Sequence, residues 1–182
     1  MTAHASLAEA DLHECKGAST ATVGKSIIAG GAGTATFKYA NPHGGIYYSD
    51  VGVGTVIAAP AAYTKLAVTT VASGMAIEFT EATTARLTYI GADTIDCRFI
   101  CNVGYTQSGA TRDGYLQLWK NGVAIAGTEQ VITCETTDKN HFTLVWDQPN
   151  IVTNDYFELY MKQAAGNITI LSLYMTALGL RG

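Results

Sequence analysis

The sequence NDYFELYMKQ, residues 154–163, carries the clearest strand pattern in this chain of 182 residues. From Tyr156 onward its residues alternate in character with a period of two, which is typical of a half-buried β-strand. A second apolar segment, at residues 167–178, follows after a short loop that contains Gly166. We predict that the two segments form a hairpin at the end of the chain.

Further strands are predicted upstream, because short runs of aromatic and β-branched residues recur after the turn signal Asn41-Pro42. They lie at residues 45–49, 55–58, 65–70, 75–80, 86–90, 94–105, 115–120, 123–125, 129–135 and 141–146. The dipeptide Asn121-Gly122 predicts a type I′ hairpin turn. No helical pattern follows residue 20, so residues 41–182 are predicted to form one all-β, antiparallel jelly-roll sandwich.

Residues 1–40 have a different character and are predicted to form an extended N-terminal arm and linker. Ser6 and Glu9 fit a capping box, which predicts a short helix over residues 7–15. Residues 17–36 consist mostly of Gly, Ala, Ser, Thr and Val. Such a segment is expected to bury too little apolar area to order itself.

The composition argues against several classes of partner. Hydrophobic residues make up 48% of the chain and charged residues only 14%, where soluble domains have about a quarter. This deficit predicts that other subunits cover part of the surface. The net charge of −4 and the scattered basic residues argue against a nucleic-acid partner. No membrane partner is expected, because no apolar stretch reaches the roughly 18 residues that span a bilayer. The N-terminus shows no signal-peptide pattern, so synthesis in the cytosol is expected.

The cysteine spacing predicts buried thiols rather than a metal site. Cys97 and Cys101 stand four residues apart on one predicted strand, about 13 Å along it and beyond disulfide reach. We expect both on the same strand face, as small apolar residues. A bridge from Cys134 to one of them stays open from the sequence, although a cytosolic origin disfavours it.

No motif predicts catalysis or cofactor binding. Residues 24–26 (Gly-Lys-Ser) match the end of a phosphate-binding loop, but Ser19 stands where that loop needs its first glycine. No histidine stands four residues after His13, and there is no Gly-x-Ser-x-Gly elbow. Asp93 and Asp96 leave a loop calcium site open as a minor alternative. We therefore predict a protein that is not an enzyme, with no catalytic residue, cofactor or metal ligand.

Residues 154–163, followed by AGNITILSLYMTALGL at residues 165–180, resemble the last hairpin of jelly-roll heads of the tumour-necrosis-factor/C1q type. The resemblance implies a homotrimer in which one sheet of each subunit is buried against the others. The aromatic residues predicted at this subunit interface are Tyr156, Phe157, Tyr160 and Tyr174.

The arm carries a second resemblance. ADLHECKG at residues 10–17 is similar to the N-termini of tailed-phage virion proteins, which often carry Asp-Leu-His-Glu-x-Lys-Gly, and Cys15 stands at the variable position. This implies a bacteriophage structural protein (a head fibre, a decoration protein or a tail-associated protein) that joins the virion in the host cytoplasm. The arm would dock on a capsid or tail protein of the same virion. The residues predicted to attach it are Leu7, Asp11, Leu12, His13, Glu14 and Lys16.

The alternative hypothesis is a carbohydrate- or receptor-binding adhesion module that recognises a host surface glycan. The best candidate is the loop at residues 105–113, which contains aromatic, amide and acidic side chains. Tyr63 and Tyr105 are the aromatic residues predicted to stack on sugars.

Overall fold

The computed structural model describes residues 25–29, 35–39, 41–50, 52–58, 60–135 and 138–180. The chain divides into two units, Met1–Ala40 and Asn41–Gly182, and each is described by itself. The helix predicted at residues 7–15 and all the predicted attachment residues lie outside the described residues.

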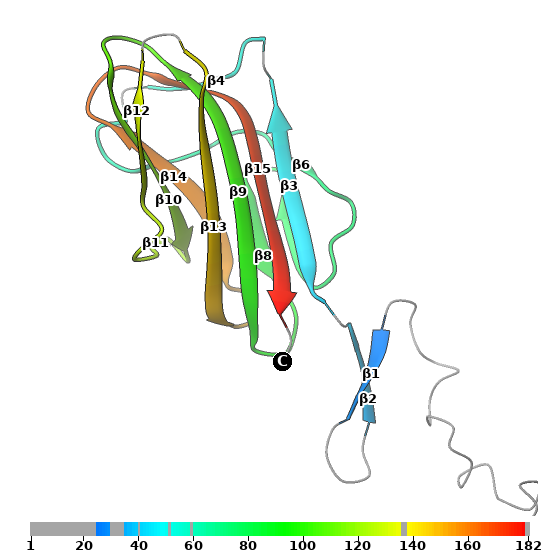
Figure 1. The fold of residues 1–182 in the computed structure, drawn as a ribbon. Helices are drawn as coiled ribbons and strands as arrows, with labels where there is room; N and C mark the ends of the chain where they lie inside the picture. Colours follow the sequence, from blue (N-terminus) through cyan, green and yellow to red (C-terminus); the bar gives the residue numbers. More distant parts are fainter. Residues whose placement is uncertain are drawn as a thin grey trace, which may run out of the picture. The chain divides into compact units, whose positions relative to one another are not determined.

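The first unit contains a two-stranded ribbon, made of β1 (Lys25–Ala29) and β2 (Ala35–Tyr39). The strands pair antiparallel, with Ile27 opposite Phe37 (Figure 1). The prediction of an unordered linker over residues 17–36 is therefore wrong at β1. Isoleucine and phenylalanine favour strands. Cross-strand pairing also satisfies the hydrogen bonds of the backbone, a contribution that amino-acid composition does not report. A ribbon of two strands is only marginally stable by itself.

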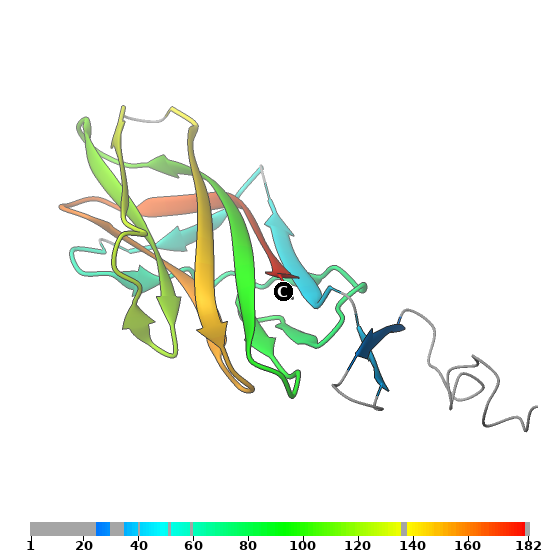
Figure 2. The same cartoon turned by 60° about the horizontal axis from the view of Figure 1, so that its bottom comes forward.

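The second unit is a sandwich of two antiparallel sheets (Figures 1 and 2). The strands of the seven-stranded sheet are β5 (Thr64–Lys65), β7 (Phe79–Ala82), β8 (Arg86–Tyr89), β10 (Arg112–Lys120), β11 (Val123–Ala124), β12 (Gln130–Cys134) and β14 (Tyr156–Gln163). Their order is β11-β10-β14-β8-β7, with β12 beside β10 and β5 beside β14.

The strands of the six-stranded sheet are β3 (His43–Ser49), β4 (Thr55–Ile57), β6 (Val71–Ala72), β9 (Ile95–Gln107), β13 (Asn140–Ile151) and β15 (Ile168–Leu180). Their order is β13-β9-β15-β3-β6, with β4 beside β15. No helix occurs in the part of the chain that the structure describes. The predicted all-β, antiparallel jelly-roll sandwich is confirmed.

The turn between β10 and β11 has the predicted geometry. Asn121 and Gly122 have φ angles of 53° and 76°, as a type I′ turn requires at both central positions. The flanking residues Lys120 and Val123 are directly opposite each other in the sheet. Here the sequence prediction is confirmed.

The predicted hairpin at the end of the chain is wrong. β14 pairs with β10, β8 and β5, whereas β15 pairs with β9, β3 and β4 in the other sheet. The loop between them, residues 164–167, carries the chain from one sheet to the other (Figure 2). A short loop makes a hairpin only when its two strands pair, and both strands here have partners distant in sequence.

Two predicted strands are shorter than expected. The strand predicted at residues 65–70 is reduced to β5, because the N–H groups of Ala67 and Val68 bond within this segment rather than to a neighbouring strand. The strand predicted at residues 75–80 begins only with β7. Glu78 has a φ of 57°, a left-handed conformation that interrupts regular strand pairing.

The core lies between the sheets. Phe99 on β9 and Phe157 on β14 are fully buried, with ring centroids 4.3 Å apart. Tyr105 and Phe142 stack at 5.4 Å. Side chains of β9 alternate between core and solvent along most of its length, as expected for a strand with one buried face.

The cysteines of the sandwich are buried and free. Cys97 and Cys101 lie on the core face of β9, as their spacing predicts. Burial raises the pKa of the Cys101 thiol to about 12. Cys134 is also free, so the bridge that the sequence left open is absent.

Candidate interaction surfaces

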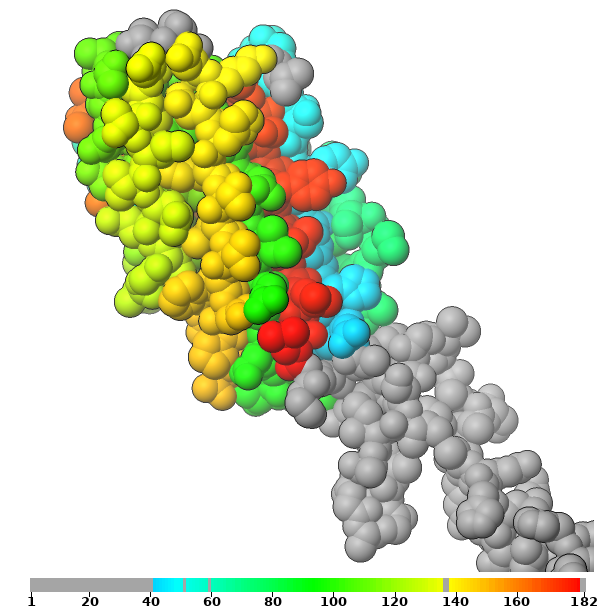
Figure 3. All heavy atoms as spheres, in the orientation of Figure 1, coloured from blue at the N-terminus to red at the C-terminus, as the bar shows by residue number. Residues whose placement is uncertain are grey.

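The outer face of the six-stranded sheet carries apolar side chains where a solvated face usually carries polar ones. Those on the adjacent strands β13, β9, β15 and β3 are 37–56% exposed. We name them the apolar face, which comprises Tyr47, Ile100, Val145, Tyr174, Leu178 and Leu180. Val145 lies opposite Ile100 and Tyr174 opposite Tyr47, so these members form two cross-strand apolar pairs. Thr176 lies opposite Ile100, between Tyr174 and Leu178 on β15. Figure 3 looks onto these four strands, which lie side by side.

A bulge in β15 decides which of its residues reach this face. The pairing with β9 shifts between Ile170 and Ser172, and both Ile170 and Leu171 are buried. Beyond the bulge the even-numbered residues face outward, which places Tyr174 on the apolar face. Its ring stacks on that of Tyr47, with centroids 5.9 Å apart and planes 22° apart.

One exposed ion pair lies beside the apolar face. Arg98 donates from Nε and from Nη2 to the two carboxylate oxygens of Asp147, each over 2.7 Å. The two residues are directly opposite on β9 and β13. The hydrogen bonds from Arg98 hold the pKa of the Asp147 carboxyl below its ordinary value. The pair therefore adds charges of both signs to this side of the sheet and no net charge.

The four predicted interface residues do not share one surface. Tyr174 lies on the apolar face, whereas Tyr156 and Tyr160 lie on the outer face of the seven-stranded sheet. Phe157 is wrong as an interface residue, because its side chain is fully buried against Phe99 inside the protomer. Period two sends neighbours on a strand to opposite faces, so Tyr156 and Phe157 cannot serve the same surface.

Sequence reasoning missed most of the apolar face. Ile100 and Val145 stand at outward positions of strands in which many residues are apolar. The feature that identifies them is that these two outward positions, which lie opposite each other, are both occupied by β-branched apolar residues. That signal is visible only when the pairing register is known.

The outer face of the seven-stranded sheet carries a second group of partly exposed aromatic residues, interleaved with charged ones. We name it the aromatic platform, which comprises Tyr63, Lys65, Arg86, Tyr115, Trp119, Glu129, Tyr156, Glu158, Tyr160 and Lys162. Cross-strand pairing brings these residues together: Lys65 lies opposite Tyr160, and Arg86 opposite Glu158.

Two ring arrangements organise the aromatic platform. Trp119 and Tyr160 stack with centroids 4.1 Å apart and planes 17° apart. The ammonium of Lys162 lies 4.4 Å from the ring centre of Tyr63 and 4.5 Å from that of Tyr115. Cations over ring faces are attracted by the ring quadrupole, so Lys162 holds Tyr63 against the sheet.

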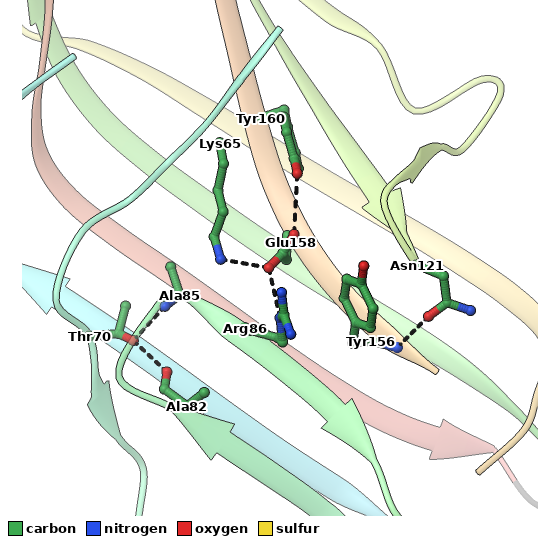
Figure 4. Close-up of polar contacts among 9 residues, drawn as sticks. All are labelled: Lys65, Thr70, Ala82, Ala85, Arg86, Asn121, Tyr156, Glu158 and Tyr160. Carbon is green, nitrogen blue, oxygen red and sulfur yellow. Dashed lines mark hydrogen bonds and ion pairs between the residues drawn. The ribbon is translucent and has the colours of Figure 1, made fainter. Parts of the chain in front are cut away.

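A buried carboxylate lies within the aromatic platform. Oε1 of Glu158 accepts hydrogen bonds from Lys65 Nζ over 2.5 Å and from Arg86 Nε over 2.7 Å (Figure 4). The hydroxyl of Tyr160 donates to Oε2 over 3.3 Å. Burial alone would raise the pKa of Glu158, but the hydrogen bonds from Lys65 and Arg86 outweigh it and lower the pKa. Glu158 is therefore ionised at neutral pH and ties three strands together.

Arg86 is also fixed from its other side. Its guanidinium carbon lies 4.1 Å from the ring centre of Tyr156, the neighbour of Glu158 along the face. Of the guanidinium nitrogens, only Nε has a hydrogen-bond partner in the described part of the chain. The side chain is 39% exposed. The terminal nitrogens of Arg86 are therefore open to a further hydrogen-bond partner, on a side chain held in place by Glu158 and Tyr156.

The loop predicted to bind sugars, residues 105–113, does not expose the aromatic ring of Tyr105. Tyr105 is fully buried, and its ring stacks on Phe142 inside the core. Its hydroxyl contacts the thiol of Cys134. Tyr105 is therefore wrong as a sugar-stacking residue, whereas Tyr63 is partly exposed on the aromatic platform.

The described residues contain no cluster of three or more histidine, cysteine or acidic side chains that could hold a metal ion. Asp96, one of the two residues considered for calcium, accepts a hydrogen bond from the backbone N–H of Asn150 over 2.9 Å. None of the elements described is a helix long and apolar enough to cross a membrane.

Sequence comparison finds no matching protein-family model and no matching curated protein. Comparison of structures finds PRD1 vertex protein P5, with a TM-score of 0.52 and 13% identity over 87% of this chain and 83% of that one. Eiger TNF from S. frugiperda aligns with a TM-score of 0.50 and 9% identity, over 77% of this chain and 94% of that one. The globular domain of zebrafish complement 1qA protein aligns at 0.42 and 7%, over 78% and 98%. At such low identity the first two likenesses show the fold alone, a jelly-roll sandwich of the tumour-necrosis-factor type.

Proposed function

We propose that this protein is a non-enzymatic structural component of a bacteriophage particle, in which the sandwich self-associates as a homotrimer. The apolar face carries this proposal. Six large apolar side chains, each more than a third exposed, lie on four adjacent strands of one sheet. Large apolar side chains gathered on one exposed face mark interaction sites in soluble proteins.

A second copy of the chain is the occupant that this surface fits. The Arg98–Asp147 pair gives charges of both signs, so copies of the face do not repel one another. The stacked Tyr47 and Tyr174 supply large, rigid ring surface of the kind that dominates binding energy in interfaces. In a homotrimer each copy packs against the next around a threefold axis, and this rotation closes the ring without open-ended growth.

The virion role rests on the arm and on the fold. The phage vertex protein PRD1 P5 has the same sandwich fold, and residues 10–17 resemble phage virion N-termini. The β1–β2 ribbon is too small to be stable without a partner. We propose that residues 1–40 dock on a capsid or tail protein, through Leu7, Asp11, Leu12, His13, Glu14 and Lys16, and that the sandwich projects as a head fibre, decoration or tail-associated protein.

Light scattering on the full chain tests self-association. The mass expected is about three times the 19.2 kDa of one chain. Tyr174→Lys replaces one ring of the Tyr47–Tyr174 stack on the apolar face with a charge and should give a monomer. Val123→Lys is the matched control, because Val123 is exposed on β11 in the other sheet. A monomeric wild type, or a trimer that survives Tyr174→Lys, contradicts the proposal.

Proteolysis tests the docking of the arm. Trypsin should cut the free chain after Lys16 and Lys25. In purified virions that mass spectrometry shows to contain the chain, both of these sites should be protected from trypsin. Equal cleavage in the particle and in the free chain would count against docking through the arm, while leaving self-association of the sandwich untouched.

A further inference from the structure

The aromatic platform has no part in the proposed self-association, because it lies on the sheet opposite the apolar face. Its side chains are nonetheless arranged as a surface rather than as a core. Tyr63, Tyr115, Trp119, Tyr156 and Tyr160 are all partly exposed on one face. Partly buried rings with a polar edge are typical of recognition surfaces, since they offer contact area at low entropic cost.

The aromatic platform and its surroundings are less negative than the chain as a whole. Three cations, Lys65, Arg86 and Lys162, face two carboxylates, Glu129 and Glu158. Asp113 stands two residues before Tyr115 on the same face of β10, so the charges around the platform balance, while the chain carries a net charge of −4. An anionic ligand is favoured at this face over the rest of the surface.

Arg86 is the group best placed to bind an anion. Glu158 engages its Nε and its guanidinium carbon lies over the ring of Tyr156, which leaves the two terminal nitrogens without a hydrogen-bond partner among the described residues on a side chain that is 39% exposed. A guanidinium held in this way matches a carboxylate or sulfate group with parallel hydrogen bonds. Because Glu158 and Tyr156 already fix the side chain, little conformational entropy remains to be lost on binding.

Beside Arg86, the stacked rings offer a surface for the remainder of such a ligand. Tyr160 follows Glu158 on the same strand face, and Trp119 lies against Tyr160. The negative face of an aromatic ring attracts the polarised C–H groups of a sugar ring. The flat face of a sheet, away from its edges, gives a peptide no backbone partner, which disfavours recognition of an extended peptide.

We propose that the aromatic platform binds an acidic saccharide, with its carboxylate or sulfate on Arg86 and its sugar ring against one outer face of the Tyr160–Trp119 stack. This places a glycan site on the face of the seven-stranded sheet rather than at the loop of residues 105–113. The site is contained within one protomer, so it does not depend on the trimer.

Saturation-transfer NMR and calorimetry on the full chain test the proposal, with sialyllactose, glucuronic-acid disaccharides and sulfated disaccharides as acidic probes and lactose as the neutral one. At least one acidic probe should bind about tenfold tighter than lactose, with an affinity that falls as salt is raised. Arg86→Gln should abolish the acidic preference, and Trp119→Ala should weaken binding of the acidic probe. Arg112→Gln is the control, because Arg112 is an arginine of β10 outside the platform.

Thermal unfolding of each variant shows whether it is folded. If Arg86→Gln is unstable, Arg86→Lys replaces it in the test, because lysine keeps the positive charge but lacks the planar guanidinium and should bind the acidic probe more weakly. Binding should persist in monomeric Tyr174→Lys, which separates failure of this site from failure of the trimer. The proposal is overturned if no acidic probe binds saturably, if lactose binds equally well, or if Arg86→Gln and Trp119→Ala leave binding unchanged. Binding of a protein ligand alone to this face would also overturn it.

Discussion

Glu158 shows how one residue links the stability of the sandwich to its surface. Its carboxylate is almost fully buried on the outward side of β14 and contacts Lys65 from β5 and Arg86 from β8. Burial of a charge costs free energy unless partners and hydrogen bonds compensate it. The two cations provide this compensation, and Glu158 in turn orients Arg86 toward solvent.

We predict that Glu158→Gln destabilises the sandwich by about 1–3 kcal/mol, since the amide leaves two cations without their carboxylate while both remain partly hydrated. The free energy of unfolding in urea measures this. Glu129→Gln, which breaks a more exposed contact with Lys162, is the control and should cost less. Equal losses in the two variants would argue against a special role for Glu158.

The same residue predicts a dependence on pH. The pKa of Glu158 is lowered in the folded chain from a reference value of 4.5, so its contribution to stability is complete above that pH. The contribution is lost as the pH falls further, through the folded pKa. In acid unfolding followed by circular dichroism, wild type and Glu158→Gln should therefore converge below about pH 4.5. A difference that grows toward low pH has the wrong sign for this account.

Among the elements, the β10–β11 turn is the one that local sequence specifies best. The side chain of Asn121 also accepts a hydrogen bond from the backbone N–H of Tyr156 over 2.9 Å and donates to Asp155 over 2.6 Å. The turn therefore fixes its own hairpin and also the start of β14. β14 in turn carries the centre of the aromatic platform.

Gly122→Ala should destabilise the sandwich by about 1 kcal/mol, because Gly122 has a positive φ that alanine adopts only with strain. The midpoint of urea unfolding measures the loss. Gly52→Ala is the matched control, since Gly52 is exposed and has no positive φ. An unchanged midpoint for Gly122→Ala would show that the turn relaxes without cost.

At the scale of the whole molecule, the inward side chains of β14 stabilise a single protomer, whereas outward side chains of β15 belong to the surface that we propose joins protomers. Phe157 faces the core against Phe99, and Tyr174 faces outward against Tyr47. Substitutions at the two positions should therefore change different properties, although both are aromatic residues near the end of the chain.

Phe157→Ala should lower the stability of each protomer by about 3–5 kcal/mol, as large-to-small changes of a buried aromatic residue do. The loss should appear in the monomeric Tyr174→Lys background as well as in wild type. If Phe157→Ala instead changed only the oligomeric mass, its assignment to the core would be contradicted.

Self-association should make the melting temperature of wild type rise with protein concentration, because association stabilises the folded protomer by mass action. The melting temperature of Tyr174→Lys should not depend on concentration. Differential scanning fluorimetry over a hundredfold range of wild-type concentration gives the measurement. A concentration-independent wild type would contradict association through the apolar face.

The class of fold, the β10–β11 turn and the burial of Cys97 and Cys101 follow from the amino-acid sequence alone. These properties depend on period two, on local turn chemistry and on spacing along one strand, all of which act between residues close in the chain. The placement of β14 and β15 in different sheets, of Phe157 in the core and of Tyr174 on the outer face emerges only from the folded arrangement of the strands. Pairing partners and the bulge at Leu171 are set by contacts between strands far apart in sequence, and a one-residue shift in register sends every later side chain to the other face.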